Sequence, residues 1–402
     1  MLDSLYVGLT GLIGFSKDLT VIGNNVANLN TVGFKSSRLL FADLFYRSQF
    51  GDAAEPGTET RFDLGSGLGT AGTQRLFSQG ELRSTGNDQD VAINGNGFFV
   101  LRRDGQTYYT RAGQFSFDAD GYLVSTSANA RAAALSGGAL QDINIHDKQT
   151  SAGKATAKVD FVGTLNSAAA APFTVSGVKV YDSAGLSHTW SIAFTNNGTA
   201  TAGSWLVAVT DENGAAVGSG EIRFGSDGTP ADGFNSIDIA LAPKDVAAST
   251  VQLYFGDPGT TNAARSLSAA SSDLHVDKQD GYGIGAMTKA IFDAAGQLVL
   301  TYSNGQTAKL DRLALASFDY LQGLRPVEGS LFAAGDEAPT LGGAGEGPFG
   351  SVSPAQVELA NVDLAQQFGN LIVTQRGYQA SSQVVSTANE MLQQLFDLKS
   401  RR

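Results

Sequence analysis

The chain has 402 residues, of which 42% are hydrophobic and 16% charged, so it can bury about two or three domain-sized cores and is not an intrinsically disordered protein. Its net charge of −12 argues against nucleic acid or an anionic membrane surface as the main partner, because both bind clustered Lys and Arg. It contains no cysteine, which excludes disulfides, thiolate zinc sites and cysteine nucleophiles.

The first predicted element is a helix over residues 1–35. Its seam positions follow a heptad spacing, and the apolar ones include Leu5, Leu9, Leu12, Leu19 and Val26. Four glycines interrupt this helix, and each costs about 1 kcal/mol relative to alanine in a helix interior. We therefore expect the helix to be ordered only when it is packed against a partner.

Membrane and targeting signals are weak at this end. No stretch approaches the ~18 consecutive apolar residues that indicate a membrane-spanning helix. The first residues also lack the basic region of a secretory signal, since the earliest basic residue is Lys17. We expect a protein without membrane insertion that is either cytoplasmic or exported by a route that cleaves no signal.

Residues 36–72 are predicted to form an extended connector. An apolar stretch, residues 39–45, comes first and is followed by a segment rich in Gly, Thr and Glu. The sequence predicts no regular structure after Phe50.

Residues 73–145 and 275–350 carry the pattern of one discontinuous β-domain. From Val91 onward, Asn-Gly and Asp-Gly pairs separate short apolar and aromatic runs, which is typical of tight hairpins. Residues 292–299 repeat the pattern of residues 117–124. So short a repeat does not establish a duplication, and hairpin chemistry alone can produce it.

Residues 146–274 are predicted to form a second β-domain, a sandwich or barrel inserted in the first. Apolar and aromatic residues alternate with polar ones over residues 186–195, and we expect His188 on the buried face of that strand. The predicted fold is therefore mainly β with α-helical termini and nested domains, the outer β-rich domain being inserted in the inner one.

The last predicted element is a helix over residues 351–402 with two heptad stripes. The apolar stripe is Val357, Leu364, Leu371, Tyr378, Val385 and Leu392. The companion stripe is mostly polar: Asn361, Phe368, Gln375, Ser382, Asn389 and Phe396. Because both terminal helices have heptad stripes, we expect them to form a coiled coil. The polar seam residues would weaken this coiled coil but fix its register. The alternative is that both amphipathic helices only cover a globular core.

Signals for catalysis are missing from the sequence. His146, His188 and His275 are far apart and do not have a metal-ligand spacing. The G-x-G-x-x-G match at residues 67–72 does not lie between a clear strand and an amphipathic helix, as a phosphate-binding loop would. The sequence predicts no catalytic, cofactor-binding or metal site, and a protein that is not an enzyme.

Three blocks of the sequence resemble the bacterial flagellar rod and hook axial protein family, hook proteins most closely. The first contains NNVANLNTVGFK (residues 24–35), the second GNGFFV (95–100) and YTRAGQF (109–115), and the third NVDLA (361–365) and QRGYQA (375–380). The signature positions of the first and third blocks are Asn24, Asn25, Asn28, Asn30, Thr31, Gly33, Phe34, Asn361, Asp363, Gln375 and Arg376. Rod proteins share these blocks, and the inserted domain favours a hook protein over a distal rod protein.

The resemblance implies a structural subunit of the flagellar hook, the universal joint that links the basal-body rod to the filament and transmits torque. The subunit would form a helical homopolymer at the extracellular hook, exported without a cleaved signal peptide. The hook cap, the distal rod protein, the hook–filament junction protein and the flagellar export apparatus would be its further partners.

The same resemblance implies that the terminal helices pack antiparallel in the inner tube of that polymer. The expected assembly residues are Leu5, Leu9, Leu12, Leu19, Val26, Leu364, Phe368, Leu371, Tyr378, Val385 and Leu392. Two alternatives stay open: a distal rod protein, and a secreted β-rich adhesin or enzyme whose terminal helices only oligomerise it.

Overall fold

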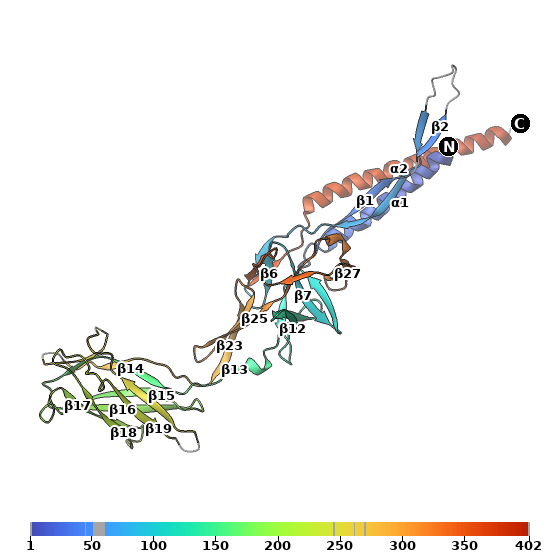
Figure 1. Cartoon of the computed structure of the whole chain (residues 1–402). Helices are drawn as coiled ribbons and strands as arrows, with labels where there is room; N and C mark the ends of the chain where they lie inside the picture. Colours follow the sequence, from blue (N-terminus) through green and yellow to red (C-terminus); the bar gives the residue numbers. More distant parts are fainter. Residues whose placement is uncertain are drawn as a thin grey trace. The chain divides into compact units, whose positions relative to one another are not determined.

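The structure, a computed structural model, describes residues 2–44, 46–50, 61–243, 246–260, 262–268 and 271–400. The chain is mainly β with one long helix near each end (Figure 1). It divides into two compact units. Unit 1 contains Met1–His146, Ala290–Val299 and Lys309–Arg402, and unit 2 contains Asp147–Lys289 and Leu300–Ala308.

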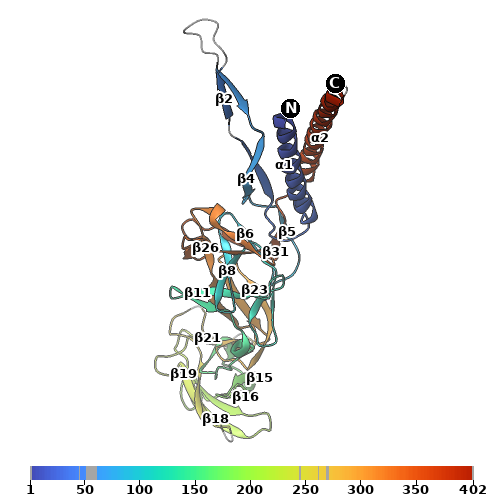
Figure 2. The same cartoon turned by 90° about the vertical axis from the view of Figure 1, so that its right-hand side faces the viewer.

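The two helices are α1 (Leu2–Ala27) and α2 (Leu364–Ser400), and they pack against each other with the two chain ends at the same side (Figure 2). The prediction of helix to residue 35 is wrong in extent. Helix α1 ends at Ala27, and the Asn28 side chain donates to the Asn24 carbonyl at 2.9 Å where the chain begins to turn.

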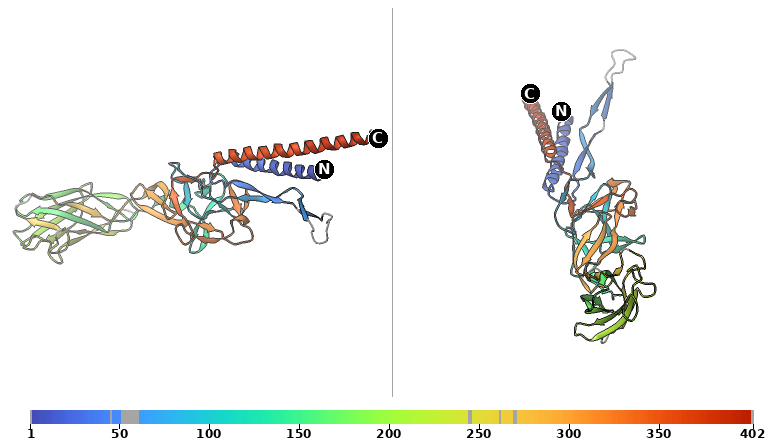
Figure 3. Two further views of the ribbon diagram at one scale, coloured as in Figure 1. Left: turned by 90° about the horizontal axis from the view of Figure 1, so that it is seen from above. Right: turned by 90° about the vertical axis from the view of Figure 1, so that its left-hand side faces the viewer.

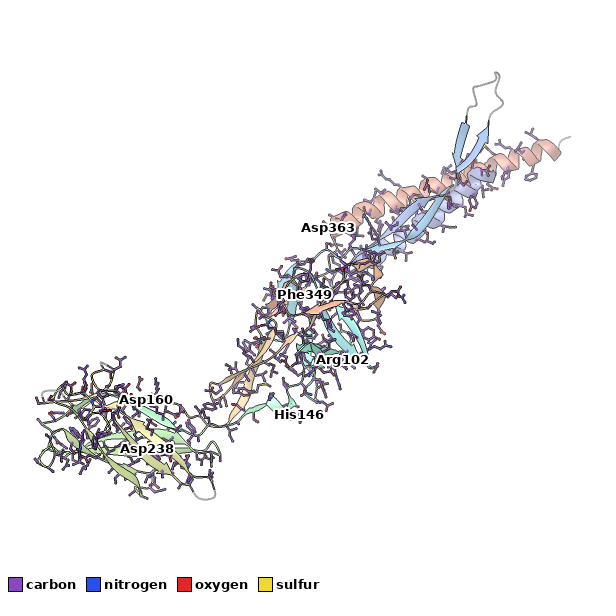
Figure 4. The ribbon with its side chains drawn as sticks, viewed as in Figure 1. Arg102, His146, Asp160, Asp238, Phe349 and Asp363 are labelled. Atoms are coloured by element: carbon purple, nitrogen blue, oxygen red, sulfur yellow. The ribbon has the colours of Figure 1, made fainter. Side chains whose placement is uncertain are left out.

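The prediction that the second helix starts at residue 351 is also wrong. Residues 351–358 contain strands β30 (Ser351–Pro354) and β31 (Gln356–Glu358), with Ala355 between them in the left-handed region at φ 53°. The heptad position of Val357 is thus occupied by a strand residue. Helix α2 starts after Asp363, whose carboxylate accepts the Gln366 N–H at 3.1 Å as an N-cap (Figure 4).

The connector is a β-ribbon, contrary to the prediction of no regular structure after Phe50. Strand β1 (Ser37–Asp43) pairs antiparallel with β4 (Leu68–Arg75), and β2 (Tyr46–Phe50) pairs with β3 (Arg61–Gly65). Residues 51–60 lie outside the described residues. Gly69, Ala71 and Gly72 give β4 little strand propensity of its own. It is therefore the pairing with the apolar β1, distant in sequence, that orders it.

Helix α1 contacts both the ribbon and α2, and Figure 2 shows it between them. The Phe15 ring lies 5.9 Å from the ring of Phe41 on β1, and a Cβ added at Gly14 would be 2.9 Å from Leu68 on β4. Two sides of α1 are therefore covered, one by α2 and one by the ribbon.

Helix α1 is more apolar overall than the lack of long apolar runs in the sequence indicated. Within the described residues, Asp3–Ala27 is long and apolar enough to do so on length and composition alone. Its charged residues are Asp3, Lys17 and Asp18, and its consecutive apolar runs are short because Gly, Ser, Thr and Asn also interrupt them. Core helices and signal sequences meet the same criterion.

The rest of unit 1 is built from short strands. They are β5 (Leu82–Ser84), β6 (Val91–Asn94), β7 (Phe98–Arg103), β8 (Gln106–Thr110), β9 (Phe115–Phe117), β10 (Leu123–Ser125), β11 (Arg131–Ser136), β12 (Ala139–Asp142), β26 (Leu315–Ser317), β27 (Arg325–Val327), β28 (Leu331–Ala333) and β29 (Thr340–Gly342). The 3-10 turn η2 (Leu321–Gly323) also belongs to unit 1, and η1 (His146–Lys148) lies at the boundary with unit 2. Strands β11, β7, β8, β28 and β27 are consecutive in one sheet, and β30 and β31 pair with β6 and β5. The ring of Phe98 packs edge-on against Phe318 and Phe332 in its core.

Three strands have residues in both units: β23 (Gly285–Phe292), β24 (Gln297–Tyr302) and β25 (Thr307–Leu313). The remaining strands belong to unit 2: β13 (Thr150–Ser151), β14 (Lys158–Asn166), β15 (Phe173–Tyr181), β16 (Ser187–Asn196), β17 (Ser204–Thr210), β18 (Ala216–Arg223), β19 (Ser236–Leu241), β20 (Ser249–Tyr254), β21 (Ala264–Leu267) and β22 (His275–Gln279).

Unit 2 is a β-sandwich. One sheet has the order β15-β16-β17-β18, and the other has the order β19-β20-β14-β21 with β22 paired to β14. A single apolar core joins the two sheets, in which Phe161 of β14 stacks on Phe255 at 5.1 Å and both rings meet Phe194 of β16. Because β22 is a strand of this sandwich, the predicted return boundary at residue 274 is too early.

Strand β16 shows the predicted alternation, with Trp190, Ile192 and Phe194 fully buried. His188 lies on the same face, where it pairs with the buried Val180, but it is only half-buried. Its side chain is 24% exposed, and Nε2 lies 3.0 Å from Oδ2 of the buried Asp182. The imidazole therefore lies at the edge of the core, where it contacts the Asp182 carboxylate.

Four hairpin turns share one Asp-x-x-Gly-x sequence, at residues 118–122, 182–186, 211–215 and 293–297. In each, Oδ1 of the aspartate accepts the backbone N–H groups two and four residues later, at 2.7–3.0 Å. The glycine has a φ of 72–81°, which an L-residue adopts only with strain. This shared turn accounts for the likeness of residues 292–299 to residues 117–124.

Candidate assembly site

Glycines let α1 and α2 approach each other closely. A Cβ added at Gly8 would lie 2.8 Å from Val385, and one added at Gly11 would lie 2.6 Å from Ser381 Oγ. On the other helix, a Cβ at Gly377 would lie 2.6–3.0 Å from the Phe15 ring. Two of the four glycines that weaken α1 as an isolated helix are thus positions where α2 approaches its backbone closely.

Polar side chains fix the antiparallel register of the pair. Thr374 donates to Asp18 Oδ2 at 2.7 Å, and the buried Asn25 donates to Gln367 Oε1 at 3.1 Å. Asn25 also exchanges two hydrogen bonds with the backbone of Ser37, at 2.7 and 2.9 Å. The same side chain therefore binds α1 to α2 and to the start of β1.

The seam between the helices differs from the predicted one. In α1 it runs along Gly11, Phe15, Asp18 and Asn25, one residue away from the predicted leucine stripe. Of that stripe Leu9 is 45% exposed, and the others are half-buried: Leu5, Leu12, Leu19 and Val26.

In α2, the residues that face α1 include Gln367, Thr374, Gly377, Ser381 and Val385. The predicted apolar stripe is divided: its half-buried members are Leu371, Val385 and Leu392, and its exposed members are Leu364 and Tyr378. The predicted companion stripe points away from α1, with Phe368, Gln375, Ser382, Asn389 and Phe396 all exposed. Gln375 and Asn389, expected to set the register, do not do so within one chain.

Large apolar side chains remain exposed on the outer faces of both helices. On α1 they are Tyr6, Val7, Leu9 and Ile13, which are 38–54% exposed. On α2 they include Phe368 (52%), Val373 (69%), Phe396 (69%) and Leu398 (68%). Helix α2 also extends past the N-terminal end of α1 (Figure 3). Apolar surface of this extent is typical of an interaction site.

A buried ionic cluster lies where the helical pair joins the β-domain of unit 1. Lys35 Nζ is 2.5 Å from Glu358 Oε1, and Arg111 Nη1 is 3.2 Å from Glu358 Oε2. The side chains are 0%, 0% and 5% exposed for Lys35, Glu358 and Arg111. Three segments far apart in the sequence are therefore held by one carboxylate.

Backbone groups complete the solvation of this cluster. Glu358 Oε1 also accepts the Gly80 N–H at 2.8 Å, Lys35 donates to the Ser78 carbonyl at 2.8 Å, and Arg111 donates to the Gly95 carbonyl at 2.8 Å. Among the described residues, Arg111 Nε has no acceptor. Burial lowers the pKa of Lys35, and the charge of Glu358 opposes this shift. Burial likewise lowers the pKa of Arg111.

The family signature residues gather around this junction. Gly33, at φ 70°, donates its N–H to the Glu358 carbonyl at 2.8 Å, and a Cβ there would be 2.4 Å from the Ala112 nitrogen. Asn361 accepts the Ser36 N–H at 2.7 Å and donates to the Leu76 carbonyl at 2.8 Å. These two signature residues therefore connect the helical pair to the β-domain of unit 1.

The other signature residues have smaller roles in this geometry. Asn24 and Asn28 bond to each other, and Asn28 accepts from Thr31 at 3.1 Å. Phe34 accepts the Asn361 N–H at 3.4 Å, whereas Asn30, Gln375 and Arg376 are exposed.

The sequence reasoning missed Lys35, Arg111 and Glu358 as a site. The signal that could have indicated them is a charged residue in or beside each of the three blocks: Lys35 ends the first, Arg111 lies in the second, and Glu358 precedes the third. Within the described residues, no group of three or more His, Asp or Glu side chains is placed to hold a metal ion.

Three family models match the chain in this order. The model for flagella basal body rod proteins matches residues 5–35, the flagellar hook protein FlgE/F/G D1 domain matches residues 92–159, and the flagellar basal body rod FlgEFG protein C-terminal model matches residues 354–398. The first and third of these contain the helical pair, and the second contains Arg111 of the ionic cluster.

Whole-chain comparisons agree with these matches. The flagellar hook protein FlgE of Borreliella burgdorferi is 31% identical over 443 residues, covering 100% of both chains. That of Escherichia coli is 30% identical and covers 97% of this chain and 98% of its own. The crystal structure of the Helicobacter pylori flagellar hook protein FlgE2 matches with a TM-score of 0.43 and 14% identity, over 68% of this chain and 98% of that one.

The antiparallel terminal helices, the signature junction and the three family models define a subunit of the flagellar rod and hook axial structures. Rod and hook subunits share these features. The relatives that match over the full length, with the inserted unit 2 included, decide between them. The chain belongs to the flagellar hook protein family and is a structural subunit of the hook.

Proposed function

We propose that this subunit polymerises with copies of itself into a tubular hook that acts as a flexible universal joint and transmits torque from rod to filament. The observation that carries the proposal is the division of each terminal helix into two faces. One face, rich in small and polar residues, is used inside the chain, and the other exposes Leu9, Phe368 and Phe396. Neighbouring copies would cover the exposed faces.

In this proposal α1 and α2 form the inner tube, and the β-domains of unit 1 and unit 2 form the middle and outer layers. Of the expected assembly residues, the exposed ones would then make contacts between copies: Leu9, Leu364, Phe368 and Tyr378. The remaining roles rest on the family resemblance: export through the flagellar export apparatus, an extracellular position, and contacts with the hook cap, distal rod protein and hook–filament junction protein.

Electron microscopy of the purified full chain tests the proposal. Curved tubular polymers are expected. Straight short rods would support a distal rod protein instead, and discrete oligomers would support an adhesin-like protein.

A pair of variants tests which face assembles. Phe368→Ser removes an exposed aromatic side chain from α2, and we expect it to reduce polymer yield on the order of tenfold, equivalent to about 1.4 kcal/mol. Tyr320→Ser is the control, since Tyr320 is 63% exposed on the β-domain of unit 1. Equal polymer yields from the two variants would contradict the proposed role of the helix face.

A further inference from the structure

The two segments by which the chain enters and leaves the sandwich of unit 2 lie side by side. The outgoing linker is residues 152–157, between β13 and β14, and the return linker is residues 280–284, between β22 and β23. Lys154 and Tyr282 exchange two backbone hydrogen bonds, at 2.8 and 3.0 Å. Lys154 Nζ also lies 3.0 Å from Asp280 Oδ2. The linkers thus form a short two-stranded ribbon.

A side chain of the return linker fastens this ribbon to the start of β14. Asp280 Oδ1 accepts the backbone N–H groups of Ala157 and Lys158, at 2.8 and 2.9 Å. Burial alone would raise the pKa of Asp280, but these hydrogen bonds and Lys154 outweigh it and lower the pKa. The carboxylate is therefore held in its charged form.

The buried Thr156 connects the ribbon to the other sheet of the sandwich. Its N–H donates to the Tyr181 carbonyl at 2.9 Å, its hydroxyl oxygen accepts the Tyr181 N–H at 2.8 Å, and the hydroxyl donates to Gln279 at 3.1 Å. Gly281 packs so closely on Thr156 that a Cβ there would be 2.2 Å from Oγ1.

The turn at residues 182–186, which follows Tyr181, contacts both linkers. Three glycines meet there: Gly185 of the turn, Gly153 of the outgoing linker and Gly283 of the return linker. A Cβ on Gly153 would be 2.5 Å from the Gly185 Cα, and one on Gly283 would be 3.1 Å from the Gly185 carbonyl oxygen. A Cβ on Gly185 would be 3.0 Å from the Ile284 side chain.

The turn itself is well anchored. The Asp182 side chain is 1% exposed: Oδ1 accepts the N–H groups of Ala184 and Leu186, and Oδ2 lies 3.0 Å from His188 Nε2. Within the described residues, only this one of the four Asp-x-x-Gly-x turns has both features: its aspartate contacts a histidine, and its glycine packs against a linker.

We propose that the turn at residues 182–186 is a strap that holds both linkers on the sandwich, so that residues 153–157 and 280–284 move as part of unit 2. Any bending of the chain between its units is then confined to residues outside the strap. The strap is a property of the single chain, and only its use in a bending hook rests on the proposed function.

Hydrogen exchange of the full-length monomer tests the strap at the amides of Lys154, Thr156 and Tyr282. Gly185→Ala is expected to speed their exchange on the order of tenfold while the amides of β16 stay protected. Gly214→Ala is the matched control: it lies in the same type of turn at φ 79°, but a Cβ there meets nothing within 4 Å. Alanine there carries the same backbone strain without touching a linker.

Gly153→Ala is the second variant, because it adds the clash with Gly185 from the linker side, outside the turn. It should speed exchange at the same three amides. The proposal is overturned if Gly185→Ala changes them no more than Gly214→Ala does, or if Gly153→Ala leaves them at the wild-type rate. Should Gly185→Ala unfold the whole sandwich, the Gly153→Ala result decides alone.

Discussion

The ammonium of Lys35 lies 2.5 Å from the carboxylate of Glu358, 323 residues further along the chain, and neither side chain is exposed to solvent. A second cation, Arg111, shares that carboxylate. The cluster thus holds two positive charges on one negative charge, in a place where water reaches none of them freely.

Glu358→Gln should strongly destabilise unit 1, because it leaves two buried cations without a counter-charge. Losing one partner of a buried ion pair costs about 3–5 kcal/mol. Urea unfolding of the full chain measures the change. Glu346→Gln is the control, since Glu346 is 58% exposed and pairs with Arg312 at the surface, where a pair contributes about 0–1 kcal/mol. Comparable losses in the two variants would show that the cluster does not stabilise the junction.

Asn25→Ala should loosen the helical pair. It removes the bonds of Asn25 to Gln367 and Ser37 and leaves buried polar groups unpaired, which costs about 1–3 kcal/mol. Asn389→Ala, at an exposed position of α2, should change stability by no more than about 0.5 kcal/mol. Thermal unfolding, followed by the circular dichroism signal of the helices, compares the stabilities of the two variants. A larger loss of stability from Asn389→Ala than from Asn25→Ala would support the predicted polar seam instead.

Two glycines of α2 should respond oppositely to alanine. At Gly369 an added Cβ meets nothing within 4 Å, so Gly369→Ala should stabilise the helix by about 1 kcal/mol. At Gly377 the added Cβ would press on the Phe15 ring, and overpacking costs about 1–3 kcal/mol. This cost cancels or exceeds the gain in helix propensity, so Gly377→Ala should not stabilise the protein. Melting temperatures of the two variants measure the difference. Equal gains would mean that the helices do not pack in this register.

Tyr254 should give unit 2 an alkaline transition. Its hydroxyl donates to Asp257 Oδ1 at 2.5 Å, and this hydrogen bond, with some burial, raises the pKa of Tyr254 to about 12. Since the folded pKa lies above the unfolded value of 10.0, the stabilisation is complete below pH 10 and is lost as the pH rises through about 12.

The tyrosinate absorbance of the wild type minus that of Tyr254→Phe isolates this group among the 11 tyrosines. Its midpoint should fall near pH 12. Tyr320→Phe, which removes an exposed tyrosine, provides the comparison. A difference spectrum for Tyr254→Phe centred near pH 10 would show that the hydrogen bond to Asp257 is not formed in solution.

Local chemistry in the sequence was sufficient for the parts of the fold that depend on short-range interactions. Heptad spacing indicated helices near both ends, and the alternation around Trp190 indicated a half-buried strand. The Asp-x-x-Gly-x turns follow from the sequence because one aspartate side chain and one glycine define each of them. The three signature blocks were likewise sufficient to place the chain in its family.

Tertiary structure decided which residues meet. A heptad pattern shows that a helix has an apolar stripe, but the glycine and polar seam around Gly11 and Asn25 makes closer contact with α2 than the leucine stripe does. The strand β4 forms because β1 is available to pair with it, and the cluster of Lys35, Arg111 and Glu358 forms because folding brings three distant segments together. Contacts of this kind depend on packing between distant parts of the chain, and local sequence does not contain that information.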